Sequence, residues 1–147
     1  MTLTAIVIGY GNELRSDDAI GPRVANLINL WHLSNVQSLA VHQLTPELAA
    51  NLANVNLAIF VDAMINSKSE DVQVEYLLPT KYNMITGHSA NPQSLLALTK
   101  SLYGCYPAAW LVTVPGVNFE LGDCLSPIAE KGIGIALTKI ISIINKV

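Results

Sequence analysis

Three acidic side chains and one histidine stand where they could do chemistry together. Asp17 and Asp18 follow a glycine-rich stretch near the N-terminus, Asp62 ends the clearest apolar run, and His88 precedes a proline-marked helix start. Two carboxylates and one imidazole with open coordination positions suit a divalent transition metal such as zinc, nickel or iron. A pair of carboxylates could instead do acid–base work as a dyad. The residue types leave both chemistries open.

The acidic pair that starts at Asp17 lies between a short apolar run and the first helical pattern. Residues 6–8 are β-branched and apolar, as in a buried strand, and Gly9 and Gly11 then mark a tight turn or a close approach to the backbone. Ser16 or Asp17 is expected to cap the following helix, because such caps are common. The second acid is then a spare carboxylate at a strand end, which makes it a candidate functional group.

Asp62 is a stronger candidate because of the run that it ends. Residues 57–61 are apolar without interruption, which is typical of a central parallel strand that is covered on both faces. A buried carboxylate costs several kcal/mol unless it is paired, hydrogen-bonded or bound to a metal. We therefore expect a functional role for Asp62.

Strands and helices alternate along the rest of the chain. Strands are expected at 6–8, 36–44, 57–63, 72–76 and 110–114, and helices over 20–32, 47–54, 92–103 and from 127 to the C-terminal end. A capping residue followed by proline marks three of the helix starts, at Thr45, Asn91 and Ser126. This order predicts a single three-layer α/β domain over residues 1–147.

The predicted sheet has five strands, is mostly parallel and twisted, and carries helices on both faces. Polar and apolar residues alternate over 72–76, so that strand is expected near an edge. The first and third strands should end side by side where the strand order reverses. Asp18 and Asp62 should meet there, and His88 could reach the same edge.

Composition and local sequence argue against several classes of function. Of the 147 residues 51% are hydrophobic, and the net charge is −3, so a basic face for nucleic acid is not expected. The uncharged window 101–119 contains two glycines and two prolines and is not a membrane span. Without a basic secretion signal, the chain is expected to be cytoplasmic. Cys105 and Cys124 form no Cys-x-x-Cys motif and are expected to be reduced, buried thiols.

Familiar cofactor and nucleophile motifs are incomplete. A dinucleotide fingerprint needs a glycine where Leu14 stands, and the phosphate loop needs a Gly-Lys-Ser/Thr that does not follow. No Gly-x-Ser-x-Gly elbow supports a serine hydrolase. No organic cofactor is expected.

Three stretches together point to one family. Gly-Tyr-Gly-Asn-Glu-Leu-Arg-Ser-Asp-Asp-Ala-Ile-Gly at 9–21, Val-Asp-Ala at 61–63 and Gly-His at 87–88 resemble the [NiFe]-hydrogenase maturation endopeptidases. The similarity in order and length covers essentially the whole chain and implies their phosphorylase/hydrolase-like fold. It implies an endopeptidase that removes the C-terminal extension of the hydrogenase large-subunit precursor once nickel has been inserted. It also implies that Asp18, Asp62 and His88 are the catalytic, metal-contacting set, with nickel supplied by the substrate.

Two positions depart from the family pattern. Asp18 stands where many members carry glutamate, so the carboxylate is one methylene shorter. His42-Gln43-Leu44 stands where Asp-Gly-Gly is common. This variant resembles the peptidases that serve bidirectional, NAD-linked hydrogenases. It makes His42, Gln43 and Leu44 candidate substrate-recognition residues at the mouth of the cleft, beside the turn after the first strand.

The resemblance leaves the mechanism and two other functions open. Metal could polarise the scissile carbonyl or lower the pKa of an attacking water, or a carboxylate could act as general base while the metal positions the substrate. We favour metal-dependent recognition with a carboxylate-assisted attack of water. A noncatalytic nickel-binding chaperone could use the same three residues. Peptidyl-tRNA hydrolases share a Gly-x-Gly-Asn turn, although the acidic composition disfavours a tRNA substrate.

Overall fold

The computed structural model describes residues 4–65, 71–81 and 90–146. Its five strands are β1 (Ala5–Tyr10), β2 (Val36–Val41), β3 (Leu57–Ile65), β4 (Gln73–Leu77) and β5 (Ala108–Gly116). Its helices are the short 3-10 helix η1 (Ser16–Ala19) and the α-helices α1 (Ile20–Leu30), α2 (Leu48–Ala53), α3 (Pro92–Tyr103) and α4 (Pro127–Lys146). The strand order is β2-β1-β3-β5-β4, and β4 alone runs antiparallel to its neighbour.

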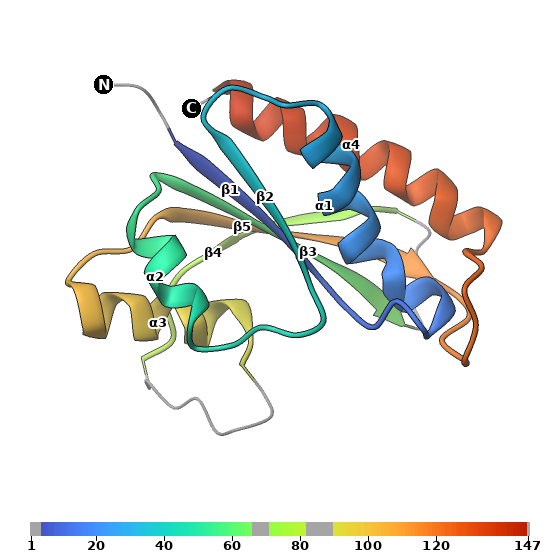
Figure 1. Cartoon of the computed structure of the whole chain (residues 1–147), viewed down its shortest axis with the longest axis horizontal. Helices are drawn as coiled ribbons and strands as arrows, with labels where there is room; N and C mark the ends of the chain where they lie inside the picture. The colour runs from blue at the N-terminus through green and yellow to red at the C-terminus, as the bar shows by residue number, and fades with distance from the viewer. Residues whose placement is uncertain (1–3, 66–70, 82–89, 147) are drawn as a thin grey trace.

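Helices cover the two faces of the sheet in pairs, with α1 and α4 on one face and α2 and α3 on the other (Figure 1). The side chains of β3 alternate between the two layers. Leu57, Ile59 and Val61 pack in the cluster under α1 and α4, whereas Ala58 and Phe60 pack under α2 and α3. All five are fully buried, so the prediction of a central strand from the uninterrupted apolar run is confirmed.

The strand register creates the edge on which the candidate site lies. β1 pairs with β2 on one side and β3 on the other, and Gly9 lies opposite Val61. The strand order therefore reverses between β1 and β3, as predicted, since β2 is added on one side of β1 and β3 on the other. Here α1 approaches β1 so closely that a Cβ at Gly9 would overlap the carbonyl oxygen of Gly21. That close packing fixes the start of α1 beside the ends of both strands.

Two of the three predicted helix starts are confirmed. The Asn91 side chain accepts a hydrogen bond from the Ser94 N–H at 2.8 Å, and the Ser94 hydroxyl accepts one in return from the Asn91 N–H at 3.0 Å. The Ser126 hydroxyl accepts from the N–H of Ala129 at 3.2 Å, within the first turn of α4. The cap at Thr45 is wrong, because no side chain caps α2, whose first residue is Leu48 and not the expected residue 47.

Other sequence predictions need correction. The second strand ends at Val41, not at residue 44, and the first helix ends at Leu30, because the chain turns earlier in both places. Cys105 and Cys124 are exposed rather than buried, since both lie in connecting segments outside the two apolar layers. Among the described residues, no helix combines the length and the apolar character that a membrane crossing needs.

Candidate functional site

Asp18 is held by the turn that follows β1. Gly11 adopts a φ of +151°, and a Cβ there would overlap the carbonyl oxygen of Asp18, so the chain folds back tightly over η1. The N–H of Asn12 then donates to Oδ2 of Asp18 at 2.7 Å. Gly9 and Gly11 therefore do what their positions in the sequence indicated, because each allows another part of the backbone to approach.

Asp62 lies at the carboxyl end of the central strand, where its side chain is half-buried. Its Oδ1 accepts a hydrogen bond from the N–H of Ala63 at 2.8 Å, and the hydroxyl of Tyr10 donates to the same carboxylate. Burial raises the pKa of Asp62 to about 6, and the negative charge of Asp18 adds to that rise, while the two hydrogen bonds oppose it.

Tyr10 is a functional candidate that the sequence did not reveal. Burial raises the pKa of its phenol, and the charge of Asp62 and the hydrogen bond to it raise this pKa further. The phenol therefore stays protonated and keeps donating to Asp62. The register of β1 and β3, which pairs Gly9 with Val61, would have placed Tyr10 level with Asp62 had the pairing been known.

The two acids of the first motif have different roles. Asp17 has no exposed surface, and its carboxylate accepts four hydrogen bonds. The donors are the N–H groups of Val117, Asn118 and Ser126 and the hydroxyl of Ser126, at 2.7–3.1 Å. Burial alone would raise the pKa of Asp17, but these donors outweigh it and lower the pKa. The expected helix cap is wrong, because neither η1 nor α1 has a side-chain cap.

Asp17 ties the segment 117–126 to the turn that carries Asp18. Backbone hydrogen bonds strengthen the connection, since the N–H of Ser16 donates to the carbonyl of Gly122 and the N–H of Gly122 donates to the carbonyl of Leu14, both at 2.9 Å. No local feature of the sequence indicates the partner of this segment, which lies about a hundred residues away.

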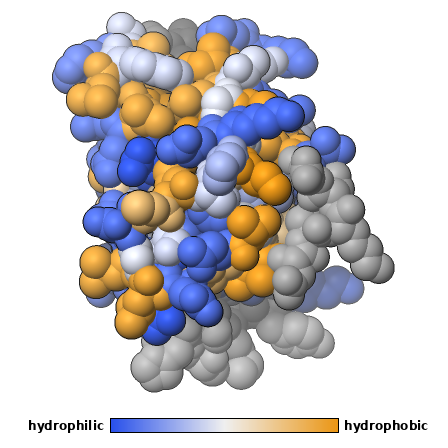
Figure 2. Space-filling view, turned by 90° about the vertical axis from the view of Figure 1, so that its right-hand side faces the viewer, coloured by the Kyte–Doolittle hydropathy of each residue, from blue (hydrophilic) through white to orange (hydrophobic). Residues whose placement is uncertain are grey.

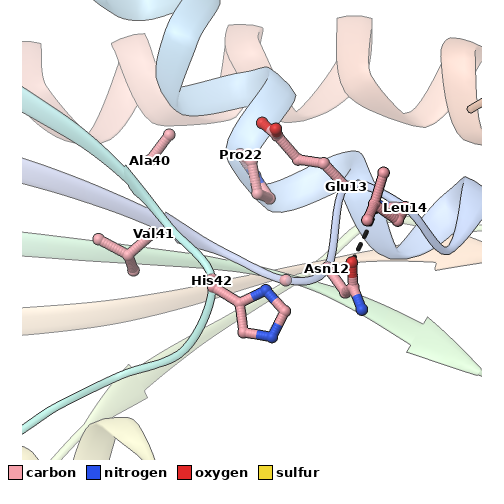
Figure 3. A pocket seen from close by; sticks show the side chains of 8 residues that line it. Asn12, Glu13, Leu14, Pro22, Ala40, Val41 and His42 are labelled. Atoms are coloured by element: carbon pink, nitrogen blue, oxygen red, sulfur yellow. Dashed lines mark hydrogen bonds between the residues drawn. The ribbon is translucent and has the colours of Figure 1, made fainter.

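A cavity of about 340 Å³ opens between the turn after β1, which also holds Asp18, and the end of β2 (Figure 3). It is lined by Gly11, Asn12, Glu13, Leu14, Pro22, Ala40, Val41 and His42. His42, just after β2, is one of these lining residues. Gln43 is exposed but does not line the cavity. Leu44 is only 6% exposed and packs in the core under α2 and α3, because α2 begins just beyond it.

The structure brings together two of the three residues expected to contact metal. Asp18 and Asp62 are close enough for the charge of one to raise the pKa of the other. His88 lies outside the described residues. Within the described part of the chain, no group of three or more His, Cys, Asp or Glu side chains could hold a metal ion. The two carboxylates by themselves offer a hydrogen-bonded, partly desolvated pair of oxygen ligands, one of which has a pKa suited to a general base.

Comparison with known proteins shows a shared fold. No family model matches the sequence, and no curated protein sequence matches it. Among solved structures, the hydrogenase maturating endopeptidase HybD from E. coli gives a TM-score of 0.79 at 22% identity, over 98% of this chain and 93% of that one. The [NiFe] hydrogenase maturation protease HycI from Thermococcus kodakarensis gives 0.75 at 20% identity, over 97% and 92% of the two chains.

A third similar structure is the hydrogenase 2 maturation peptidase from Thaumarchaeota archaeon SCGC_AB-539-E09. Its TM-score is 0.73 at 22% identity, over 97% of this chain and 98% of that one. The chain thus has the α/β fold of the [NiFe]-hydrogenase maturation proteases over nearly its whole length.

Proposed function

We propose that this protein is an endopeptidase that removes the C-terminal extension of a nickel-loaded [NiFe]-hydrogenase large-subunit precursor. The observation that carries the proposal is the carboxylate pair of Asp18 and Asp62, which lies at the reversal point of the sheet. The fold supports it, because structures of the same fold and nearly the same length are named as hydrogenase maturation peptidases.

In the proposed reaction Asp62 is the general base. A carboxyl with a pKa of about 6 is mostly ionised at neutral pH, yet it binds a proton much better than an ordinary aspartate. It can therefore take a proton from the water that attacks the scissile carbonyl. The hydroxyl of Tyr10 and the N–H of Ala63 hold the carboxylate in place for that transfer.

Nickel enters this scheme as part of the substrate. Asp18, Asp62 and His88 would contact the metal already bound to the precursor, so that only a loaded precursor is positioned for cleavage. Asp62 would contact it through one carboxylate oxygen and would take the proton on the other. Carboxylates and imidazole are suitable ligands for a divalent transition metal. A metal ion at this place would also polarise the scissile carbonyl. No organic cofactor is needed.

The carboxyl edge of the sheet has features suited to a protein partner. Figure 2 views the molecule from this edge and shows apolar side chains at the surface among polar ones. Four apolar residues that are each more than half exposed come from the segments that end here, namely Leu14, Ile65, Val117 and Leu121. The precursor would cover them. We place the reaction in the cytoplasm. We name the bidirectional, NAD-linked type of hydrogenase as the source of the precursor because His42-Gln43-Leu44 resembles the variant of the peptidases that serve it.

The decisive experiment is incubation of the protein with nickel-loaded and nickel-free precursor, followed by intact-mass measurement of the large subunit. We expect loss of a C-terminal peptide only from the loaded form. A stable complex with an unchanged precursor mass would instead identify a noncatalytic nickel-binding chaperone.

Position 18 tests whether charge matters beyond the shape of the turn. Asn retains an oxygen that can accept from the N–H of Asn12, so Asp18→Asn should leave the turn intact while removing a metal-binding charge. We expect a loss of cleavage rate of roughly a hundredfold or more. Asp18→Glu keeps the charge and should retain partial activity. Equal activity of the two variants, with unchanged circular dichroism, would reduce Asp18 to a residue that shapes the turn.

The loop after β2 tests recognition of the precursor. We expect His42-Gln43→Asp-Gly to slow cleavage of the cognate precursor several-fold and to leave the melting temperature unchanged, because both side chains are exposed. Leu44 is kept, since truncating a buried leucine costs about 2–5 kcal/mol by itself.

The matched control for this loop is His32→Asp, which makes the same exchange at an exposed site before β2, at the opposite edge of the sheet. Cleavage of the precursor is followed by mass spectrometry for both variants. If His42-Gln43→Asp-Gly cleaves as fast as His32→Asp, the loop does not select the precursor.

A further inference from the structure

The cavity between the turn after β1 and the end of β2 is small. Its volume of about 340 Å³ is at the small end of the range for ligand pockets. Pro22 at the start of α1 and His42 just after β2 lie on either side of it (Figure 3). β2 is an edge strand of the sheet, so the cavity can be reached from solvent at the side.

The lining combines apolar walls with a single carboxylate. Leu14, Pro22 and Ala40 supply apolar surface, and Glu13 is the only Asp or Glu among the lining residues that the structure describes. The Glu13 side chain extends along Pro22 at the rim of the cavity (Figure 3). It is exposed and forms no ion pair with any other residue that the structure describes. A lysine or arginine side chain complements such a lining, because its aliphatic stem packs on apolar surface while its charged end meets a carboxylate.

The cavity is joined to the carboxylate pair through one residue. The N–H of Asn12 donates to Asp18 at 2.7 Å, while the same residue lines the cavity. A peptide that passes over Asn12 would therefore have its backbone next to Asp18 and one side chain in the cavity. We propose that this cavity is a specificity subsite for a lysine or arginine side chain of the peptide that is cleaved. This assignment rests on the proposed function for the source of the peptide, but binding of the cation itself does not need cleavage.

The test uses two small probes that differ only in charge, N-acetyl-arginine amide and N-acetyl-citrulline amide, whose side chains have nearly the same shape. Each is titrated at low ionic strength into the 15N-labelled protein, and the backbone amide signals of Gly11, Val41 and His42 are followed. We expect the arginine probe to shift these signals and to bind about two- to fivefold more tightly than the citrulline probe, as is typical for an exposed ion pair. Low salt matters because screening weakens such pairs.

Matched variants then identify the carboxylate responsible. Glu13→Gln should remove the preference for arginine, whereas Glu75→Gln, which removes the same charge from the opposite edge strand β4, should keep it. The proposal is overturned if the arginine probe leaves the three signals unmoved, if both probes bind equally to the unaltered protein, or if Glu13→Gln retains the preference. Because these outcomes are read without any precursor, they are distinct from a failure of the proposed peptidase activity.

Discussion

Replacement of Asp62 by alanine is expected to abolish cleavage of the nickel-loaded precursor, with a loss of about a thousandfold or more. The proposed general base is removed, and with it one of the carboxylates that contact the metal of the substrate. The rate is measured by intact mass after single-turnover incubation. The control is Glu75→Gln, an exposed acid of β4 on the other side of the sheet, which should cleave at the original rate.

The Asp62 carboxylate should lower the free energy of unfolding at neutral pH. The variant Asp62→Asn makes this effect measurable. Its pKa in the folded protein is about 6, against an ordinary value of 3.8. Because the folded-state pKa is raised, the contribution to stability is complete below about pH 3.8 and is lost as pH rises through about 6. At full ionisation the difference corresponds to about 3 kcal/mol as an upper limit. Asp62→Asn has no such loss and keeps an oxygen for the N–H of Ala63.

We therefore expect the free energy of unfolding of Asp62→Asn, relative to that of the unaltered protein, to increase from pH 4 to pH 7. Urea unfolding followed by circular dichroism at both pH values provides the measurement. Cleavage at the original rate by either Asp62 variant would exclude Asp62 as the base. A stability difference that shrinks as pH rises would show that its carboxylate is not held at an energetic cost.

Local patterns in the sequence predicted the features that depend on neighbouring residues. The apolar run 57–61 identified the central strand, because only a strand buried on both faces can be apolar at every position. The alternation over 72–76 identified an edge strand, which the structure shows as β4. Asn91 before proline identified the start of α3, because a cap and a fixed φ act within a single turn.

Features that depend on contacts between distant parts of the chain could not be predicted from the sequence. Ser16 or Asp17 had been expected to act as a local cap, yet Asp17 binds donors in 117–126, and nothing near it in the chain indicates them. The position of Leu44 after the second strand predicts a place at the cleft, but its side chain packs in the core because α2 begins just beyond it. Tyr10 was overlooked because its contact with Asp62 depends on the register between β1 and β3. The order of strands and helices predicts which strand ends meet at the site. The different roles of Asp17 and Asp18 become visible only in the packed structure.

That separation leads to the largest expected effect on stability. Asp17→Asn should lower the free energy of unfolding by about 3–5 kcal/mol at pH 7. Both carboxylate oxygens of Asp17 accept hydrogen bonds, one from the N–H of Ser126 and the other from three further donors. An amide group must turn its own N–H₂ toward one of these sets, so buried donors lose their acceptor. Segment 117–126 would then be held to the turn that carries Asp18 mainly by the backbone hydrogen bonds of Ser16 and Gly122.

The pH dependence of this loss has the opposite sign to that at Asp62. Because hydrogen bonding lowers the folded-state pKa of Asp17, its contribution is present above the ordinary aspartate pKa and is lost as pH falls through the lowered value. The gap between Asp17→Asn and the unaltered protein should therefore be widest at neutral pH and close in acid, as followed by urea unfolding at several pH values.

Asp18→Asn is the matched control for Asp17→Asn, because it makes the same exchange one residue later. Among the described residues Asp18 accepts one hydrogen bond, from Asn12, and its side chain is partly exposed, so its replacement should cost less than about 1 kcal/mol. We expect the two variants to have different effects: Asp17→Asn should lose stability, and Asp18→Asn should lose cleavage activity. Equal and small stability losses would mean that the four hydrogen bonds of Asp17 do not hold 117–126 in place, and the division of labour between the two acids would fail.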